Sequence, residues 1–401
     1  MAYLKSFKAY RLKQEWAEEV AALPYDVMSI DEAKEMTKGH PYSFLNIDKP
    51  EIHDAYLGEA RYHYAQAHLQ KMIEEGIYQQ DEESLYIYEL QVEGMHQYGL
   101  VGLVSTEEYK MNVIKKHEKT RVDKEDDRKA HILHCKAHTG PIFLIEDKIS
   151  GFGEQLMMQT ANQKPIIDVQ FEDGVSHRIY QMSKPQIINH LVKTFEAVPA
   201  LYIADGHHRA AAAVRVAEDL PSNEEAKNFL AVIFPKEQLH ILAYHRVLKD
   251  ESHLSKDELF DKIKKCFDVE EAKEALYIPS QKHSFGMRYQ GKWYTLKYKM
   301  SLLKGADAVA SLDVAILQNA ILAPIFGIED PKNDPRIDFV PGIRPVETLN
   351  DLTDDKMDIA FSMFPTTIDE LIAVADEAGL MPPKSTWFEP KLRSGFFIHT
   401  F

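Results

Sequence analysis

The stretch 201–213 constrains the fold more than any other part of the chain. It begins with the apolar run Leu-Tyr-Ile, which is typical of a buried strand, and continues into Asp205-Gly206, which is typical of a tight turn. Four alanines at 210–213 then favour a helix. The sequence therefore predicts a strand, a turn and a helix in immediate succession.

The polar residues of this turn predict a phosphate site. We expect the carboxylate of Asp205 to cap the helix by accepting the free amides of its first turn. His207, His208 and Arg209 bring three possible cations to a helix N-terminus, which already presents unpaired N–H groups and a positive potential. The alternative is that Asp205 is only a cap and the histidines are only polar residues of a first turn. Because cations are unfavourable at this end of a helix unless an anion offsets them, we favour a bound anion.

Length and composition define the class of protein. The chain has 401 residues, of which 45% are hydrophobic, so it is long enough for two or three domains with sizeable cores. It has no apolar run near the length of a membrane-spanning helix, and its first residues lack the apolar region of a signal peptide. Two cysteines provide no disulfide framework, which fits a reducing compartment. We expect a cytoplasmic protein without a membrane partner.

The charge argues against nucleic acid as a partner. The formal net charge is −16 at pH 7. Proteins that grip nucleic acid usually present a basic field, whereas this chain would repel a polyanion except at local basic sites. A small-molecule substrate is therefore the expected partner.

Strand and helix patterns follow each other without strict alternation, which is typical of an α+β fold. The predicted elements used below are a helix over 51–75, a hairpin over 84–106, a charged segment over 121–129 followed by a helix over 130–136, and a strand over 229–234. A boundary is predicted near 249–251.

One cluster has the residue types of a metal site. His131, His134, Cys135 and His138 have spacings that place them roughly on one helical face, and zinc is bound by three or four such ligands. A single helix seldom encloses a metal, and no CxxC or HExxH motif supports the cluster. We predict a partly buried polar face and no metal.

Six blocks of sequence, in order along nearly the whole chain, resemble the bacterial family called domain of unknown function 1015. The most specific block is Y-I-A-D-G-H-H-R at 202–209. After it, three alanines stand where the family often has Tyr-Glu-Thr. The other blocks are Leu23-Pro24-Tyr25-Asp26-Val27, Pro41-Tyr42-Ser43-Phe44-Leu45, His117-Glu118-Lys119-Thr120 with Asp127-Arg128, His245-Arg246, and Lys384-Ser385-Thr386 with Pro390-Lys391.

The resemblance implies a fold. The family looks distantly similar to the ParB/sulfiredoxin superfamily, in which a strand–turn–helix holds nucleotide phosphates. It implies a ParB/sulfiredoxin-like core over 111–248, flanked by α+β segments over 1–110 and 249–401. Sulfiredoxin carries a cysteine where this chain has His207, so the resemblance argues against sulfinic-acid repair. The similar archaeal kinases that phosphorylate free L-serine are the nearer chemical match.

The resemblance also implies a reaction, namely phosphoryl transfer to a hydroxyl, with free L-serine as the expected acceptor. The expected cofactor is Mg²⁺ with ATP, ADP or pyrophosphate as the donor. The alternatives are a non-catalytic nucleotide-binding switch and a metal-dependent hydrolase; no Walker A motif, kinase glycine-rich loop or GxGxxG occurs. The expected site residues are Asp26, Glu118 and His208 for catalysis, Asp205, Gly206, His207, His208, Arg209, His117, Thr120 and Arg128 for the phosphate, and Lys384, Ser385, Thr386, His245 and Arg246 for the substrate.

Overall fold

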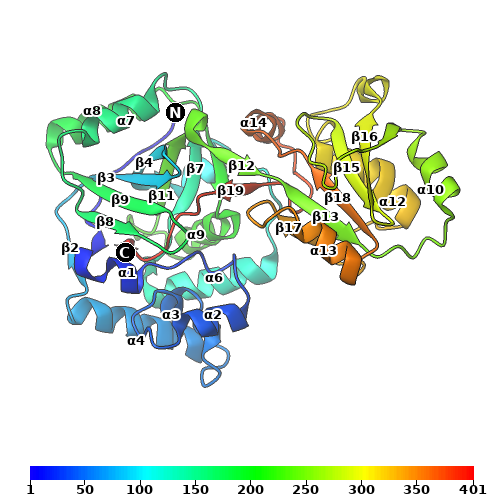
Figure 1. Ribbon diagram of the computed structural model, residues 1–401. Coiled ribbons are helices and arrows are strands. Elements are labelled where there is room, and N and C mark those ends of the chain that lie inside the picture. The colour runs from blue at the N-terminus through cyan, green and yellow to red at the C-terminus, as the bar shows by residue number, and fades with distance from the viewer. The chain divides into compact units, whose positions relative to one another are not determined.

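The structure is a computed structural model that describes residues 1–401, and it divides into two compact units (Figure 1). Unit 1 comprises Met1–Leu239 and Pro390–Phe401, and unit 2 comprises His240–Glu389. These units do not follow the boundaries that the sequence predicted. Residues 1–110 and 111–239 share unit 1, the change of unit comes at residue 239 rather than near 249, and the chain returns to unit 1 at its C-terminal end.

Unit 1 contains two sheets. The eight-stranded sheet has the order β5-β10-β7-β11-β4-β3-β9-β8 and mixes parallel with antiparallel pairs, and the four-stranded sheet has the order β2-β1-β20-β6. The strands are β1 Tyr10–Leu12, β2 Tyr78–Gln80, β3 Leu85–Val92, β4 Met95–Ser105, β5 Ile114–Lys115, β6 Ala137–His138, β7 Ile142–Glu146, β8 Ile167–Gln170, β9 Ser176–Met182, β10 Leu201–Asp205, β11 Asn228–Pro235 and β20 Phe397–Thr400. The predicted hairpin over 84–106 is confirmed by β3 and β4, and the predicted strand over 229–234 is confirmed by β11.

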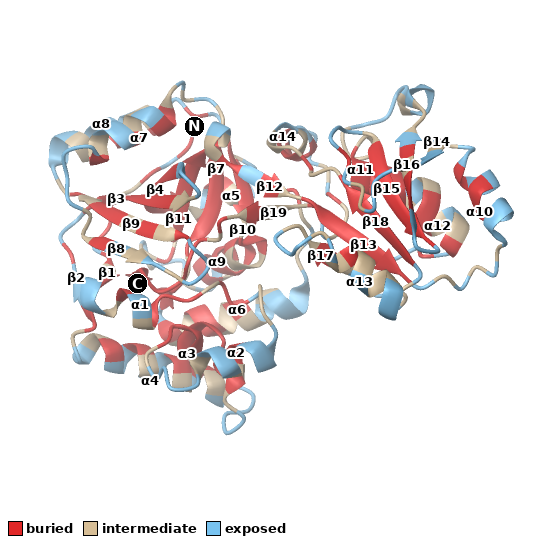
Figure 2. Ribbon diagram, viewed as in Figure 1, coloured by how far each residue is buried: buried red, intermediate tan, exposed pale blue.

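Helices cover these sheets, and most of these helices have one buried face and one face exposed to solvent (Figure 2). They are η1 Gln14–Trp16, α1 Ala17–Val20, α2 Ile30–Thr37, α3 Leu45–Asp48, η2 Pro50–Ile52, α4 Ala60–Glu74, α5 Thr106–Lys110, α6 Val122–Cys135, α7 Phe152–Thr160, α8 Pro185–Phe195, α9 His207–Asp219 and η3 Lys236–Gln238.

Two predicted helix boundaries are wrong. The charged segment 121–129 belongs to α6, because its charged side chains make ion pairs with neighbouring helices, such as Lys129 with Asp219 of α9 at 2.7 Å. The helix predicted over 51–75 begins only at Ala60, since Pro50 starts a short 3₁₀ turn and Gly58 has a positive φ of 56°.

Helix α9 follows the turn at 205–206, which we call the signature turn together with the residues up to Arg209. The helix is held on two sides. Ala210 and Ala213 of α9 pack into the core of the large sheet, beside Leu201 and Ile203 of β10. Ala212 packs with Ile132 of α6. Alanine has the smallest apolar side chain, so this run lets α9 approach the sheet and α6 closely. The strand–turn–helix predicted for 201–213 is therefore confirmed and rigidly placed.

Unit 2 has a six-stranded antiparallel sheet of order β14-β16-β15-β18-β13-β17 and the strand pair β12-β19. Its elements are β12 His240–Leu242, β13 Tyr244–Leu248, α10 Lys256–Ile263, β14 Phe267–Glu271, β15 Ser284–Tyr289, β16 Lys292–Tyr298, η4 Met300–Leu303, α11 Asp313–Leu317, η5 Gln318–Leu322, α12 Ala323–Phe326, β17 Ile337–Pro341, α13 Thr348–Asp355, β18 Ile359–Met363, α14 Ile368–Asp376 and β19 Trp387–Glu389. The predicted α+β class is confirmed.

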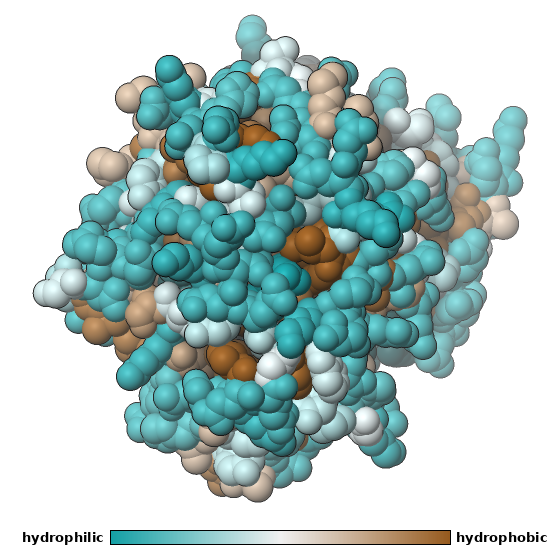
Figure 3. All heavy atoms as spheres, turned by 90° about the vertical axis from the view of Figure 1, so that its left-hand side faces the viewer, coloured by the Kyte–Doolittle hydropathy of each residue, from teal (hydrophilic) through white to brown (hydrophobic).

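Figure 3 shows a face of the molecule on which hydrophilic residues predominate and hydrophobic ones form only small, separate patches. None of the helices has both the length and the apolar character needed to cross a bilayer.

Candidate functional site

The signature turn joins β10 to α9 through Gly206. This glycine has a φ of 94°, a left-handed conformation that side chains other than glycine adopt only with strain. The first intrahelical hydrogen bond runs from the amide of Ala210 to the carbonyl of Gly206 at 2.9 Å, so the amides of His207 and Arg209 lie ahead of it. Asp205 does not cap the helix, contrary to our prediction: Gly206 is the N-cap residue and no side chain caps the helix.

Two cations hold the carboxylate of Asp205 instead. Arg209 Nη2 lies 3.0 Å from one carboxylate oxygen, and Lys391 Nζ lies 3.6 Å from the other. Burial favours the neutral carboxyl, but Lys391 and Arg209 outweigh it and keep the pKa of Asp205 below its ordinary value. Arg209 also donates to the carbonyl of Pro141 at 2.6 Å, and its Nε is buried without an acceptor.

The predicted histidines His117 and His207 pack against each other, with ring centroids 4.5 Å apart. Burial lowers the pKa of His117 to about 4 and holds the pKa of His207 well below its ordinary value. His207 Nε2 accepts the amide of His117 at 3.5 Å, so Nδ1 carries the proton and faces Glu118 Oε2 at 3.7 Å. These two imidazoles are therefore neutral near pH 7, and the prediction of three cations in the turn is wrong.

The structure also brings His208, Glu118 and Thr120 to this end of α9. His208 Nε2 accepts the amide of Arg121 at 3.2 Å. Thr120 donates its hydroxyl to Glu125, which lies on α6. The segment 117–121 is thus fixed against the start of α9.

Asp26 lies at the exposed tip of a firmly held turn. Lys49 donates to the carbonyl of Tyr25 at 2.7 Å and to that of Met28 at 3.2 Å, while the guanidinium of Arg128 lies 4.1 Å from the centre of the Tyr25 ring. The Asp26 carboxylate makes no hydrogen bond or ion pair, but its charge acts on Arg209. The turn therefore presents a partnerless carboxylate within electrostatic reach of the signature.

Arg128, predicted to bind phosphate, is committed to the protein. It is 3% exposed, donates from Nη2 and Nε to one carboxylate oxygen of Asp127 at 2.6 and 2.8 Å, and donates to the backbone carbonyl of Asp48 at 2.8 Å. The side chain of Asp48 accepts from Thr139 at 3.0 Å, and its second oxygen is buried without a donor. Arg128 and Asp48 thus form the buried support beneath Arg209 and Tyr25.

The predicted substrate residues lie in unit 2, where they form one cluster. Arg246 is 3% exposed, donates to the carbonyls of Tyr244 and Lys384, and lies 5.3 Å from the centre of the Phe339 ring. No carboxylate neutralises it, and burial lowers the pKa of Arg246 to about 10.

The remaining predicted substrate residues pack around this arginine. His245 accepts the amide of Met363 at 3.1 Å, and burial lowers its pKa to about 4. Lys384 is exposed with a left-handed φ of 55°, Ser385 is buried with its hydroxyl donated to Pro382, and Thr386 is half-buried.

Two of the histidines considered as metal ligands form hydrogen bonds to backbone carbonyls instead. His131 Nε2 donates to the carbonyl of Ile47 at 2.8 Å, and His134 Nδ1 donates to that of Ala130 at 2.7 Å. Burial raises the pKa of Cys135 to about 12, so its thiol is protonated, and His138 is fully buried. The structure has no group of three or more His, Cys, Asp or Glu side chains arranged to hold a metal.

Sequence reasoning missed Lys391 and Lys49. Lys391 lies in the Pro-Lys block that the sequence comparison singled out, but its distance along the chain gave no reason to place it at the signature. Lys49 follows the Pro-Tyr-Ser-Phe-Leu block by only a few residues. Both residues could have been found because each is a lysine within or beside a sequence block of the family.

The comparisons with known proteins agree with these sequence blocks. The model of the family described as "Protein of unknown function (DUF1015)" matches residues 4–315. Among curated proteins, none matches the chain.

Several solved structures share part of the arrangement. One is a free serine kinase in complex with AMP, at 13% identity and a TM-score of 0.36, over 72% of this chain and 86% of that chain. Another is a conserved hypothetical protein from Pyrococcus furiosus, at 13% identity and a TM-score of 0.37, over 74% and 94% of the two chains. A third is SbnI with a C-terminal truncation from Staphylococcus aureus, at 12% identity and a TM-score of 0.37, over 73% and 84%. Similarity at this level carries no inference about ligand or reaction.

Proposed function

The chain belongs to the DUF1015 family of proteins of unknown function, and we propose that it is a small-molecule kinase. In this proposal it transfers a phosphoryl group from ATP, ADP or pyrophosphate to a hydroxyl, with free L-serine as the acceptor. The single observation that carries the proposal is the convergence of Arg209 and Lys391 on Asp205 at the N-terminus of α9.

This arrangement suits a phosphoryl group. Two permanent cations, Arg209 and Lys391, contact one carboxylate at this turn, although the chain as a whole is acidic. The helix N-terminus adds backbone N–H groups and a favourable dipole. Phosphoryl transfer needs chiefly positioning and neutralisation of the equatorial oxygens, which Arg209, Lys391 and these amides supply. The buried, unpaired Nε of Arg209 is a further donor suited to an oxygen ligand.

Asp26 is our first candidate for the group that accepts the proton of the attacking hydroxyl. Its carboxylate is exposed, lacks a partner and is carried by a rigid turn near Arg209. Mg²⁺ sites of kinases usually combine one or two carboxylates with phosphate oxygens and water, so Asp26 also suits that ion, which would neutralise phosphate charge. Glu118, beside His207, is the second candidate base.

Serine as the acceptor rests on the resemblance to free serine kinases. The carboxylate of an amino acid needs a cation, and the sequence offered Lys384 or Arg128 for it. Arg128 is already paired with Asp127, and Lys384 lies in unit 2, where its carbonyl accepts a hydrogen bond from Arg246.

The test is a donor-by-acceptor assay on the full chain. Protein, L-serine and Mg²⁺ are incubated with ATP, ADP or pyrophosphate, and O-phosphoserine is measured by mass spectrometry. Arg209→Ala should lower the rate by at least about tenfold, because charge-assisted hydrogen bonds are worth roughly 1.5–3 kcal/mol each. Arg215→Ala, on the same helix, is the matched control and should keep activity.

Two results contradict the proposal. The first is the absence of product with every donor; tight nucleotide binding without turnover would then support the nucleotide-binding switch. The second is full activity in both His208→Ala and Arg209→Ala, which would place the chemistry away from the signature turn.

A further inference from the structure

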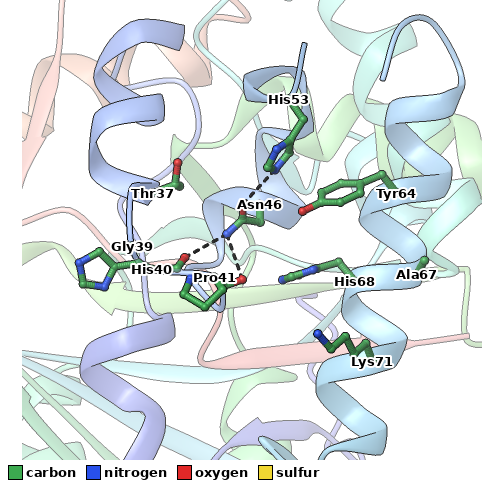
Figure 4. A pocket seen from close by; sticks show the side chains of 10 residues that line it. All are labelled: Thr37, Gly39, His40, Pro41, Asn46, His53, Tyr64, Ala67, His68 and Lys71. Atoms are coloured by element: carbon green, nitrogen blue, oxygen red, sulfur yellow. Dashed lines mark hydrogen bonds between the residues drawn. The ribbon is translucent and has the colours of Figure 1, made fainter. Parts of the chain in front are cut away.

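Unit 1 contains a pocket of about 640 Å³ whose lining includes Pro41 of the Pro-Tyr-Ser-Phe-Leu block (Figure 4). It lies between helix α4 and the loop that joins α2 to α3. Its volume falls in the range of small-molecule sites, roughly 300–1,000 Å³. Its lining residues are Thr37, Gly39, His40, Pro41, Asn46, His53, Tyr64, Ala67, His68 and Lys71.

One face of α4 forms a wall of this pocket. Tyr64, Ala67, His68 and Lys71 follow the spacing i, i+3, i+4 and i+7, so they lie on the same side of the helix. Figure 4 shows the side chains of Tyr64, His68 and Lys71 directed toward the opposite loop. A helix that packed against the protein here would carry apolar residues at these positions. A phenol, an imidazole and an ammonium group are instead the residue types of a polar ligand site.

The opposite wall is fixed in place by Asn46. Its amide nitrogen donates to the carbonyls of His40, Pro41 and Ser43 at 3.3, 3.3 and 2.9 Å, and its oxygen accepts from His53 Nε2 at 2.9 Å. The loop therefore keeps its shape without a ligand. A preformed wall spares a ligand the entropic cost of ordering it.

The pocket differs in charge from the rest of the chain. The protein carries a net charge of −16, yet the lining has a lysine and three histidines and no carboxylate. The two acids bonded to lining residues lie outside it: Glu19 bonds His40 at 2.9 Å, and Glu75 lies 3.8 Å from Lys71. Lys71 thus offers a cation to an anionic group of a ligand.

His68 sets a second requirement. Burial lowers the pKa of His68, so its imidazole is neutral near pH 7. A neutral imidazole has one nitrogen that donates and one that accepts. The Nε2 atom of His68 is buried without a hydrogen-bond partner. A ligand that brings a hydroxyl or amine to Nε2, one helical turn from the cation of Lys71, would satisfy it.

The aromatic stack around Tyr64 limits the kind of ligand. One face of the Tyr64 ring is stacked on Tyr56 at 4.6 Å, and a parallel contact with His68 lies at 5.6 Å. His53 also lies against this ring, with its centroid 4.5 Å away, so three aromatic neighbours leave little of the Tyr64 ring for a nucleobase to stack on. A compact, non-aromatic molecule fits these constraints better than a nucleotide.

We propose that this pocket binds a small hydroxy- or amino-acid anion, with its carboxylate on Lys71 and its hydroxyl or amine hydrogen-bonded to His68 Nε2. The site is separate from the signature turn: its residues come from α2, the loop after it, α3 and α4. The inference does not rest on the proposed kinase activity.

Isothermal titration calorimetry on the full chain tests the site with glycerate and L-serine as probes, and with glycerol and inorganic phosphate as comparisons. Glycerate or serine should bind, glycerol should not because it lacks the charge, and phosphate should bind more weakly because it fills little of the pocket. Lys71→Met and His68→Phe should each weaken the acid by at least about tenfold. Lys8→Met, an exposed lysine outside the pocket, is the control and should keep wild-type affinity.

Arg209→Ala tests whether the acid binds in this pocket or at the signature turn. It should leave the affinity for glycerate and serine unchanged, because Arg209 does not line the pocket. The proposal is overturned if neither acid binds, or if Arg209→Ala abolishes binding while Lys71→Met and His68→Phe do not. Thermal melts show which variants remain folded. If one pocket variant does not fold, the other decides the result.

Discussion

Lys391 Nζ lies 3.6 Å from the carboxylate of Asp205, although unit 2 separates the two residues in the sequence. Through this contact the last segment of unit 1 reaches the signature turn, where Arg209 holds the other oxygen of the same carboxylate. The charge balance of the turn, two cations to one carboxylate, leads to the first two predictions.

Asp205→Asn should lower the free energy of unfolding by roughly 1–3 kcal/mol at pH 7, because it leaves Arg209 and Lys391 without their shared counter-charge. The folded pKa of Asp205 is depressed, so its stabilisation is present above the pKa of an unfolded aspartate, about 3.9, and is lost as the pH falls through the lower folded value. Urea denaturation between pH 7 and pH 3 should show the two proteins converging in acid. A difference that stayed constant over this range would contradict the ion-pair account.

Lys391→Met should weaken binding of the phosphate donor by at least about tenfold and change the fold little, because the methionine keeps the apolar stem but loses the charge. Calorimetric titration with ATP, ADP and pyrophosphate gives the affinity. Lys391→Arg is the matched variant and should recover most of it. Equal affinity in the wild type and Lys391→Met would remove Lys391 from the site.

His117→Gln should flatten the dependence of stability on pH. Burial lowers the pKa of His117 to about 4, while an unfolded histidine titrates near about 6.5. The unfolded state then binds more protons between these values, so the folded state is fully favoured above about 6.5 and loses stability as the pH falls toward 4. The loss amounts to roughly 1.4 kcal/mol per pH unit for one such group.

Denaturation midpoints at several pH values measure this slope, with His190→Gln, an exposed histidine of α8, as the control. A slope identical in the wild type and His117→Gln would mean that His117 is not neutral in the folded protein.

Gly206→Ala should disturb both stability and the site. The φ of 94° costs an alanine roughly 1–2 kcal/mol, and its Cβ would lie 3.2 Å from Arg209 Nη2. Gly94→Ala is the matched control, since Gly94 has a φ of 81° in the β3–β4 turn with nothing within 4 Å. Both variants should lower the melting temperature, but only Gly206→Ala should weaken donor binding. Equal binding by the two variants would show that the position of Arg209 is not critical.

Local patterns in the sequence were sufficient to predict those helices, strands and hairpins that are determined by residues close together in the chain. The apolar run before Asp205 and the alanines after it predicted β10 and α9, and the hairpin of β3 and β4 followed from its strand residues and turn. The α+β class was also predictable from the mixture of strand and helix patterns.

Properties that depend on distant partners could not be predicted in this way. Asp205 has the chemistry of a helix cap, but Lys391 arrives from the other end of the chain and competes with the backbone amides for its carboxylate. His207 was predicted as a possible cation because its burial, which keeps the imidazole neutral, depends on tertiary structure. The charged start of α6 looked like a loop because its ion-pair partners on α9 lie far along the chain.

The position of strand β20 between β1 and β6 means that part of unit 1 can be completed only late in translation. This strand pairs with β1 on one side and with β6 on the other, and the segment that leads to it supplies Lys391. A ribosome makes all of unit 2 before it makes this segment, so the nascent N-terminal part must wait with the edges of β1 and β6 unpaired. The turn around Asp205 gains its second cation only when translation has passed residue 391. Formation of the Asp205–Lys391 contact thus distinguishes a polypeptide whose synthesis has passed residue 391 from one that was interrupted upstream.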